Sequence, residues 1–180
     1  MLPYEACNLG SINLSLFVNT SEFDYPLFKN YIWLCTRFLD NVIDANKYPL
    51  PQIHELCNNN RKIGLGIMGF ADALFKLGIP YNSKEGVAFG EKVMGFLQTE
   101  SHKASEALAI ERGTFPNWKG SRWELEWNMS VRNACVTTVA PTGTISIIAN
   151  CSGGMEPMFS LAFQRNVLDG QKLTEVNEVF

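Results

Sequence analysis

The residues best suited to bind an anion lie between a predicted strand and a predicted helix in the last third of the chain. Residues 136–139 are β-branched and predict a short buried strand that ends at Ala140. The next residues turn the chain into a helix start, which Thr142 or Thr144 would cap. Such a turn aims free backbone N–H groups and the positive end of a helix dipole at one point, which suits a phosphate. The predicted phosphate loop consists of Pro141, Thr142, Gly143, Thr144, Ile145 and Ser146.

Ordinary helix capping is the alternative interpretation of this loop. Threonine and glycine are common at helix starts where no ligand is bound. The chain has no G-x-x-x-x-G-K-[ST] pattern, so the loop is not that of a P-loop nucleotidase.

Five cysteines are the other candidates for chemistry. Their odd number and the lack of C-x-x-C spacing argue against a structural zinc site and against a secreted disulfide framework. Cys35 lies on the apolar stripe of a predicted helix and Cys135 enters the predicted strand, so we expect both to be small core residues. The five are Cys7, Cys35, Cys57, Cys135 and Cys151.

Cys7 differs from the others because small polar residues surround it. On residue types alone such a cluster is most simply a turn. From Ile12 to Phe17 apolar and polar residues alternate, which favours a strand, although a short helix also fits. The small polar neighbours are Asn8, Gly10, Ser11 and Asn13.

Two long helices must position these residues. The first is predicted to start at Asp24, with Pro26 in its first turn, and to end near Lys47 before two prolines. The second should run from Ser83 to Gly113. The first helix carries two adjacent apolar stripes, which predict one broad buried face. These stripes are Leu27, Tyr31, Leu34 and Phe38, and beside them Phe28, Ile32, Cys35, Leu39 and Val42.

Residues 64–69 spell G-x-G-x-x-G, a pattern found in dinucleotide-binding folds. That fingerprint needs a hydrophobic strand just before the first glycine and an acidic residue after a second strand. Residues 58–62 are too polar for a buried strand, and no strand is predicted after Gly69. The better interpretation is a helix whose glycines allow close approach to a neighbour, with Gly78 as its C-terminal cap.

The 180 residues suit one domain, and 46% of them are hydrophobic while 18% are charged, which predicts a globular interior. The net charge is −3 and no Lys/Arg run exists, so we expect neither a nucleic-acid nor an anionic-membrane partner. No apolar run approaches the ~20 residues of a membrane span. Without a basic segment after Met1, a cytoplasmic location is expected. His54 and His102 are isolated, so no metal site is predicted.

The end of the chain should form a sharp loop from Cys151 to Pro157 and then a strand through Phe159, Leu161 and Phe163. Glu156 in this loop could bind substrate or could pair with Arg165. The sequence stops at Phe180 in an apolar stretch without a cap, so both ends are expected to be cut.

Four stretches together resemble the large catalytic subunit of ribonucleotide reductase. They are more similar to the adenosylcobalamin-dependent class II form than to the iron-dependent class I form. These stretches are EACNLGSINL at Glu5–Leu14, NRKIGLGIMGFADAL at Asn60–Leu74, VAPTGTIS at Val139–Ser146 and SGGMEP at Ser152–Pro157.

The resemblance implies an α/β fold, the later part of a ten-stranded α/β barrel incomplete at both ends. Residues 1–180 would be one partial catalytic barrel domain of an oxidoreductase that makes 2′-deoxyribonucleotides by thiyl-radical chemistry. It implies adenosylcobalamin, bound mostly outside this chain, and an external dithiol reductant. The implied partners are the ribonucleotide substrate, a thioredoxin-like reductant, the missing N-terminal part of the enzyme and, in a homodimer, a second copy.

The resemblance also assigns site residues. It places the substrate phosphates on the loop from Pro141 to Ser146 and makes Cys7 one thiol of a redox pair whose partner is absent from the chain. Asn8, Ser11 and Glu156 are expected near the substrate. The N-x-C-x-E motif of the radical cysteine has no match here, so the piece is expected to be inactive alone.

Two alternatives to this function remain open. One is a class I subunit that uses the radical of a partner protein. The other is a non-catalytic nucleotide-binding module. The sequence also leaves open whether the substrates are diphosphates or triphosphates.

Overall fold

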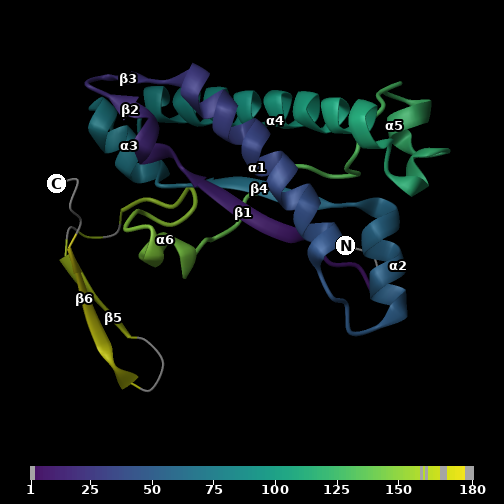
Figure 1. The fold of residues 1–180 in the computed structure, drawn as a ribbon. Helices are drawn as coiled ribbons and strands as arrows, with labels where there is room; N and C mark the ends of the chain where they lie inside the picture. The colour runs from purple at the N-terminus through teal and green to yellow at the C-terminus, as the bar shows by residue number, and fades with distance from the viewer. Residues whose placement is uncertain (1–2, 159, 161, 167–169, 177–180) are drawn as a thin grey trace.

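The computed structural model describes residues 3–158, 160, 162–166 and 170–176, and Figure 1 shows their mixed α/β arrangement. The strands are β1 Asn8–Asn13, β2 Val18–Asn19, β3 Glu22–Phe23, β4 Ile63–Met68, β5 Ala162–Asn166 and β6 Lys172–Val176. The α-helices are α1 Tyr25–Ala45, α2 Pro51–Asn60, α3 Phe70–Leu77, α4 Lys84–Arg112, α5 Arg122–Leu125 and α6 Ile145–Ile148. Two short 3₁₀ helices are η1 Leu14–Phe17 and η2 Pro116–Trp118.

The centre of the molecule is a parallel pair of strands, β1 and β4, in which Asn8 is level with Ile63 and Asn13 with Met68. A third row lies on the other side of β4. It is an extended segment joined by one parallel bridge between Leu65 and Thr137. The predicted strand over residues 136–139 is therefore wrong in extent. The hydrogen bonds between the two rows join Cys135, Val136 and Thr138 to Ile63 and Leu65, and they form only one bridge. No closed barrel forms among the described residues.

Strand β4 corrects the helix predicted over the glycine-rich stretch. All six of its residues are buried, so it lacks the alternation by which a half-exposed strand is recognised. Close approach is still the reason for the glycines: a Cβ on Gly66 would lie 2.7 Å from the carbonyl oxygen of Thr138. The neighbour is thus the extended segment and not a helix. Gly78 caps α3 in the left-handed conformation, as predicted.

Strand β1 begins and ends earlier than the alternation predicted. It covers residues 8–13, and residues 14–17 form η1. The Asn13 side chain accepts hydrogen bonds from the Ser15 N–H at 3.1 Å and from the Ser15 hydroxyl at 2.8 Å. This local bonding competes with the strand ladder and turns the chain into the 3₁₀ helix.

Helix α1 starts and ends where predicted, since the Asp24 carboxylate accepts a hydrogen bond from the Leu27 N–H at 2.8 Å. Its buried face is narrower than predicted. Leu34 is 61% exposed and Phe38 is 63% exposed. Only the neighbouring stripe faces β1, β4 and α4. These three elements lie on one side of α1, so the other stripe points away from them. Its buried residues are Phe28, Ile32, Thr36, Leu39, Asp40 and Ile43.

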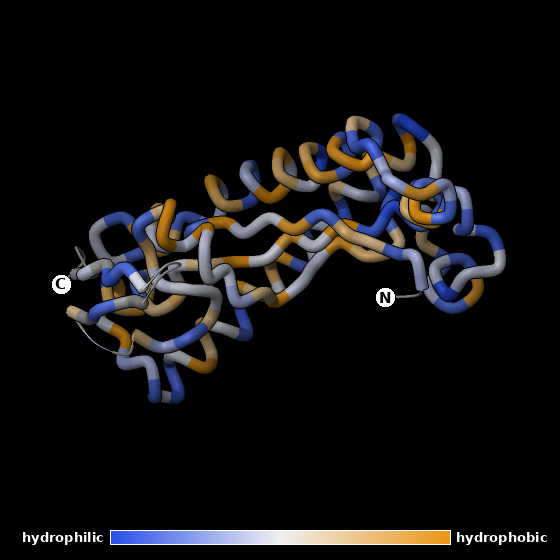
Figure 2. The backbone as a smooth tube through the Cα atoms, turned by 90° about the horizontal axis from the view of Figure 1, so that it is seen from below, coloured by the Kyte–Doolittle hydropathy of each residue, from blue (hydrophilic) through white to orange (hydrophobic). Residues whose placement is uncertain are grey.

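Helices α1 and α4 lie together on one face of the β1–β4 pair, and α6 lies on the other side (Figure 1). Ser83 caps α4 by accepting from the Gly86 N–H, and Gly113 ends it, both as predicted. None of the helices among the described residues is long and apolar enough to cross a membrane. In Figure 2, apolar and polar residues alternate along the helical turns.

The last described residues form an antiparallel hairpin of β5 and β6, which extends away from the helices (Figure 1). The predicted strand through Phe163 is present as β5, whereas Phe159 and Leu161 lie outside the described residues. The segment between α4 and the extended row contains the short helices η2 and α5. The Trp118 indole donates to the Met129 carbonyl at 2.8 Å and the Trp123 indole to the Ala134 carbonyl at 3.0 Å, which anchors it.

A buried carboxylate, that of Asp40 on α1, ties these elements together. Its side chain is fully buried, and its Oδ1 accepts from Arg61 Nε at 2.9 Å and from Asn133 Nδ2 at 2.9 Å. Arg112 on α4 approaches the other oxygen at 3.4 Å. Arg61 also donates to Asp44 at 2.8 Å and 2.9 Å. The carboxylate therefore joins α1, the end of α2, α4 and the extended row.

We expect Asp40→Ala to lower the free energy of unfolding by about 3–5 kcal/mol, because it removes the buried one of the two carboxylates that pair with Arg61 and leaves Asn133 without its acceptor. Urea denaturation followed by circular dichroism measures this. Glu126→Gln is the matched control, because it removes an acid from an exposed pair with Arg122 at 2.9 Å. The control should cost less than about 0.5 kcal/mol. Equal losses in the two variants would contradict the role given to Asp40.

Candidate functional site

The β1–β4 pair has one face covered by helices and one that we call the open face. A Cβ on Gly10 would contact Leu39 of α1, so Gly10 faces the helices. A Cβ on Gly64 would instead meet the side chains of Leu9 and Thr138. Because side chains alternate along a strand, Leu9 and Ser11 belong to the open face. Leu9 is 59% exposed there.

Cys7 lies at the amino end of β1, next to this face, and is half-buried. Burial raises the pKa of its thiol, and the nearby Cys135 and Glu5 raise it further. Lys62 acts in the opposite direction. The thiol of Cys7 is therefore un-ionised at neutral pH, which suits a group that donates hydrogen and not one that attacks as a thiolate.

The segment before Cys7 is fixed by a buried carboxylate. The Glu5 side chain is fully buried, and it accepts from Lys62 Nζ at 2.8 Å and from Asn60 Nδ2 at 2.8 Å. Cys57, which is buried on α2, contacts the Ala6 N–H through its sulfur at 3.4 Å. These contacts hold Cys7 against the start of β4.

Two of the cysteine predictions have different outcomes. Cys35 packs against the hydrophobic core, as expected. Cys135 is exposed, so the prediction of a core residue is wrong. The physical reason is the side-chain alternation of an extended segment: the next residue, Val136, takes the core position and is 2% exposed.

The two polar residues expected near the substrate on β1 point in different directions. Asn8 donates from its side-chain amide to the Leu39 carbonyl of α1 at 3.3 Å, on the helical side. Ser11 lies on the open face, with its hydroxyl 3.5 Å from where a Cβ on Gly66 would be. Of the two, Ser11 is the one placed on the same face as Cys7.

The predicted phosphate loop ends in a helix of a single turn, α6. Thr144 occupies the N-cap position of α6, as one of the two predicted caps, but its side chain makes no capping hydrogen bond. The Thr142 hydroxyl accepts instead from the Gly154 N–H at 2.7 Å. Thr142 has a positive φ of 55° and is buried, as is Ser146. The loop residues that reach the surface are Pro141, Gly143, Thr144 and Ile145.

A second loop, residues 150–157, supports the first and is anchored on α3. The Ser152 N–H donates to the Asp72 carboxylate at 2.6 Å, and the Gly69 N–H donates to the Ser152 carbonyl at 2.8 Å. Asp72 is 1% exposed. Since Thr142 bonds to Gly154, the start of α3 determines where both loops lie.

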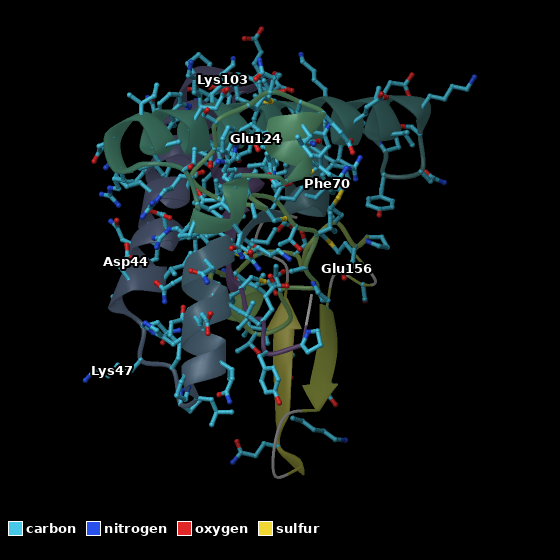
Figure 3. The ribbon with its side chains drawn as sticks, turned by 90° about the vertical axis from the view of Figure 1, so that its right-hand side faces the viewer. Asp44, Lys47, Phe70, Lys103, Glu124 and Glu156 are labelled. Carbon is cyan, nitrogen blue, oxygen red and sulfur yellow. The ribbon has the colours of Figure 1, made fainter. Side chains whose placement is uncertain are left out.

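Glu156 is half-buried in this second loop, between the helices and the β5–β6 hairpin (Figure 3). Its carboxylate lies beside the backbone of Gly153 and Gly154. The Tyr81 hydroxyl donates to the adjacent Met155 carbonyl at 2.8 Å. The predicted alternative, a pair between Glu156 and Arg165, is not tested, because the Arg165 side chain is outside the described side chains.

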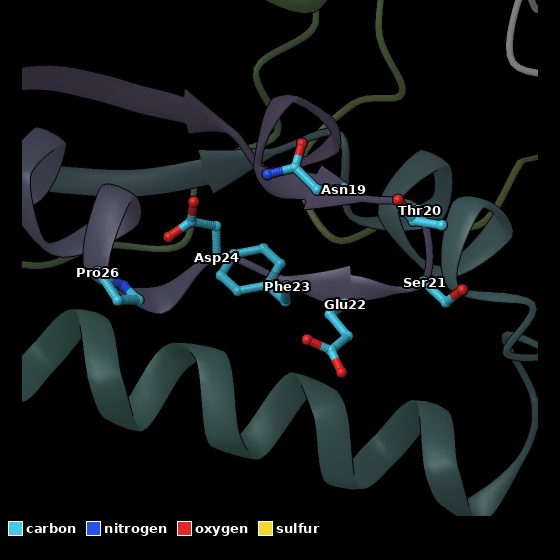
Figure 4. Close-up of a pocket in the computed structure, with 7 residues that line it drawn as sticks. All are labelled: Asn19, Thr20, Ser21, Glu22, Phe23, Asp24 and Pro26. Carbon is cyan, nitrogen blue, oxygen red and sulfur yellow. The ribbon is translucent and has the colours of Figure 1, made fainter.

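Two hollows formed by described residues bear on the search for a site. One of about 350 Å³ adjoins the phosphate loop, and its lining residues are Tyr81, Val139, Ala140, Pro141, Met155, Glu156 and Pro157. A larger one of about 630 Å³ lies at the β2–β3 hairpin (Figure 4). The larger hollow contains none of the predicted site residues, and one of its acids, Asp24, is occupied as the cap of α1.

Cys7 and the phosphate loop lie at opposite ends of the same strand pair. Cys7 precedes β1, whereas the loops gather at the carboxyl end, where a Cβ on Gly69 would meet Asn13 and Cys151. Six residues of β1 correspond to about 20 Å. The two predicted parts of the site are therefore separated by most of the length of β1.

Among the described residues, no three His, Cys, Asp or Glu side chains are grouped in a way that could hold a metal ion. His102 packs edge-on against Trp123 with ring centroids 5.2 Å apart, and burial lowers its pKa. Its surroundings on α4 are those of a packed aromatic residue.

Sequence reasoning missed Glu5, Lys62 and Asp72. An acid in the first turn of a helix, such as Asp72, is a recognisable signal. Its partner Ser152 is 80 residues away, and no local pattern indicates that pairing.

Comparisons with known proteins agree on one family. The family model described as "Ribonucleotide reductase, barrel domain" matches residues 2–130 and 128–180. A vitamin B12-dependent ribonucleoside-diphosphate reductase of Thermoplasma acidophilum is 60% identical over 100% of this chain and 23% of its own length. Its counterpart in Mycobacterium tuberculosis strain H37Rv is 47% identical over 100% of this chain and 25% of its own length.

A more distant relative is the ribonucleoside-diphosphate reductase subunit alpha of Chlamydia pneumoniae. It is 33% identical over 92% of this chain and 19% of its own length. The chain thus spans about a quarter or less of the curated relatives that it matches.

Burial and the neighbouring Asp72 carboxylate raise the pKa of Cys151 to about 11. Because only the thiolate reacts with iodoacetamide, we expect the alkylation rate of Cys151 to keep rising with pH until about 11. Peptide mapping by mass spectrometry measures the profile. Asp72→Asn removes the charge and should move the midpoint to lower pH, whereas Glu126→Gln should not. A wild-type midpoint near the ordinary value of about 8.5 would contradict the assignment.

Proposed function

This chain belongs to the ribonucleotide reductase family, and from that premise we propose that it forms part of the catalytic barrel of an enzyme that reduces ribonucleoside diphosphates to 2′-deoxyribonucleotides. The observation that carries the proposal is the match to vitamin B12-dependent reductases over the whole chain, at 60% identity for the first of them. The identity falls to 33% for the subunit alpha of Chlamydia pneumoniae, whose name carries no vitamin B12 dependence, and this difference favours the class II form over class I. No feature of the open face favours a non-catalytic nucleotide-binding module.

In this proposal Cys7 is one of the two thiols that deliver electrons to the substrate. Removal of the 2′-hydroxyl as water takes two electrons, and a dithiol that becomes a disulfide supplies two. The second thiol belongs to a part of the enzyme outside these residues. The resulting disulfide is reduced by an external dithiol, for which a thioredoxin-like protein is the proposed partner.

The proposed phosphate contacts are narrower than those expected from the sequence. Thr142 is engaged by Gly154, and the Ser146 hydroxyl lies 3.5 Å from the Gly143 carbonyl, so these two hydroxyls frame the loop. The backbone of residues 143–145 and the Thr144 hydroxyl are left to meet the phosphates. Ser11 lies partway along the open face between this loop and Cys7, and Glu156 lies beside the loop.

We propose adenosylcobalamin as the cofactor because the nearest relatives named above are vitamin B12-dependent. When bound, it supplies the radical that starts the reaction. Its corrin ring holds the cobalt itself, so the protein need supply no cluster of metal ligands, and none of the described residues is assigned to the cofactor. Its binding surface is therefore assigned mostly to the rest of the enzyme.

The rest of the barrel is proposed to continue from the free edge of β1, which pairs only with β4 among the described strands. A ten-stranded barrel would add a strand there. An exposed apolar stripe on α1 supports this proposal, because such a surface is normally covered by another part of the protein. The stripe consists of Leu27, Tyr31, Leu34 and Phe38. A homodimer is the competing cover.

We place the enzyme in the cytoplasm. All five cysteines of the chain are free, which fits a compartment that keeps thiols reduced.

Cys7→Ser in the complete enzyme should abolish repeated formation of deoxyribonucleotide with an external dithiol, because the variant cannot form the redox disulfide. Chromatography of the products measures the rate. Cys35→Ser, a change to a half-buried thiol on α1, is the matched control and should keep the wild-type rate. An unchanged rate in Cys7→Ser would reject the assigned role, as would ribonucleotide reduction by the 180-residue piece alone.

Replacing Leu34 and Phe38 by Gln should reduce the self-association of the 180-residue piece, because these side chains are 61% and 63% exposed. Light scattering and sedimentation velocity measure it. Ile110→Gln is the control, since Ile110 is 89% exposed on α4, outside the stripe. If the stripe forms a homodimer in the complete enzyme, the double variant will be monomeric there. If the barrel covers it, the oligomeric state of the complete enzyme will not change.

A further inference from the structure

We propose that Asp72 and Ser152 are positioning residues for the substrate: together they fix the second loop on the start of α3, and the second loop in turn holds the phosphate loop in the shape that binds phosphate. This role deepens the proposed function and rests on it in one respect, namely that the phosphate loop meets the substrate phosphates. The connection between α3 and the two loops is a separate matter, because it consists of hydrogen bonds that need no ligand.

The start of α3 is only half of a capping box. Its N-cap residue is Gly69, which has a left-handed φ of 69° and no side chain with which to cap. The first N–H groups of a helix have no partner within the helix, so they need an acceptor from elsewhere. Asp72 is the third residue of α3, the position whose acidic side chain reaches back to the cap residue in a capping box. The capping side chain itself must therefore come from another segment.

Ser152 supplies this missing half from the second loop. Its N–H donates to the Asp72 carboxylate at 2.6 Å, and its hydroxyl accepts from the Asp72 N–H at 3.4 Å. These are the two reciprocal contacts of a capping box, made here between residues 80 apart in the chain. In addition, the Gly69 N–H donates to the Ser152 carbonyl at 2.8 Å. Both backbone polar groups of Ser152 and its hydroxyl are thus bound to the start of α3.

The neighbours of this serine hold the phosphate loop. On one side, the Cys151 N–H donates to the Ser146 carbonyl at 3.0 Å. On the other side, the Gly154 N–H donates to the Thr142 hydroxyl at 2.7 Å. The residues between these two contacts, 143–145, are the ones proposed to meet the phosphates. The second loop therefore fixes the phosphate-binding segment at both of its ends.

The two loops are also in close backbone contact. A Cβ on Gly154 would lie 2.9 Å from the Ala140 carbonyl oxygen, and a Cβ on Gly153 would lie 3.1 Å from the Pro141 carbonyl oxygen. The next residue, Thr142, has a φ of 55°, which is rare for a β-branched residue. Such a backbone conformation persists only where surrounding contacts hold it. The phosphate loop therefore keeps its shape only while the second loop stays in place.

Tyr81 is another support of the second loop, but it lies at the surface. Its hydroxyl donates to the Met155 carbonyl at 2.8 Å, and the residue is 41% exposed. Asp72, in contrast, is 1% exposed. Water can replace a hydrogen bond at the surface more easily than one to a buried carboxylate. The positioning role is therefore assigned to Asp72 and Ser152 and not to Tyr81.

A role in positioning the phosphates has a kinetic signature. The phosphates take no part in the bonds that break and form at the sugar, so the loop binds them equally in the ground state and in the transition state. Binding of this uniform kind sets KM and leaves kcat unchanged. A loop that the ligand must first order binds more weakly, because part of the binding free energy is used in the ordering. Loosening the second loop should therefore raise KM without lowering kcat.

The first test needs no ribonucleotide. Hydrogen exchange of the complete enzyme is followed by mass spectrometry in peptides that cover residues 140–157. We expect this exchange to be several-fold faster in Asp72→Ala, because the loops open more often when their anchor is lost. Asp24→Ala is the matched control, since Asp24 also accepts from an N–H at a helix start, that of Leu27 at 2.8 Å, but touches neither loop. The control should exchange these peptides at the wild-type rate.

Asp72→Asn is the milder variant for the same measurement. An amide oxygen accepts less strongly than a carboxylate, so the exchange should speed up by a smaller factor. This variant decides the matter if Asp72→Ala does not fold, and circular dichroism checks the folding of both. Exchange at the wild-type rate in whichever variant is folded would overturn the inference, even if the enzyme reduces ribonucleotides.

The second test measures the steady-state kinetics of the complete enzyme with a ribonucleoside diphosphate. Asp72→Asn should raise KM about fivefold, the difference expected between a charged and a neutral hydrogen bond, with kcat unchanged. Asp24→Asn should leave both constants at their wild-type values. A wild-type KM in Asp72→Asn, or a fall in kcat alone, would refute the positioning role. If the wild-type enzyme reduces no ribonucleotide, the proposed function fails, and the exchange measurement still decides whether α3 holds the loops.

A double variant tests whether Asp72 acts through Thr142. Thr142→Val removes the hydroxyl that accepts from the Gly154 N–H and keeps the shape of the side chain. Because the two changes break one line of contacts, the KM of the double variant should exceed that of the worse single variant by little. Increases in KM that multiply would show that the two residues act independently, and they would contradict the proposed connection.

Discussion

The arrangement of the molecule depends on one buried carboxylate, Asp40, which cannot remain charged in the interior unless every oxygen lone pair is satisfied. Its partners Arg61 and Asn133 stand just before β4 and just before the extended row. The ion pair therefore aligns the beginnings of two neighbouring rows of backbone. Cys7 and Cys135 lie at these beginnings, so an interaction with no chemical role of its own sets the geometry of the thiol end of the open face.

Sequence reasoning succeeded where a signal is local. Asp24, Ser83 and Gly113 mark helix ends through capping contacts three or four residues long, and these ends are where they were predicted. It failed where burial depends on distant partners. Strand β4 is buried on both faces, so its sequence lacks the alternation that predicts a strand. The sequence of α1 has two apolar stripes, and nothing in it shows which stripe is buried, because that depends on which one faces β4 and α4.

The candidate site shows the same difference between local signals and contacts with distant residues. The motifs around Cys7 and residues 141–146 led to the family, and the comparisons confirmed it. Their supports are contacts between residues far apart in the chain: Lys62 to Glu5, Ser152 to Asp72 and Gly154 to Thr142. The residue type of one member of such a pair does not predict the other member. Thr142, which was expected to cap a helix, therefore accepts a hydrogen bond from the Gly154 N–H, and this contact is seen only in the folded chain.

Gly64 and Gly66 also limit how the two rows beside β4 can vary. The Leu9 and Thr138 side chains close over Gly64 and the Thr138 carbonyl lies over Gly66, so a Cβ at either position would collide with them. The outer rows can therefore lie this close to β4 only while both positions carry a hydrogen atom in place of a side chain. A substitution at either glycine will push an outer row away and change the width of the open face.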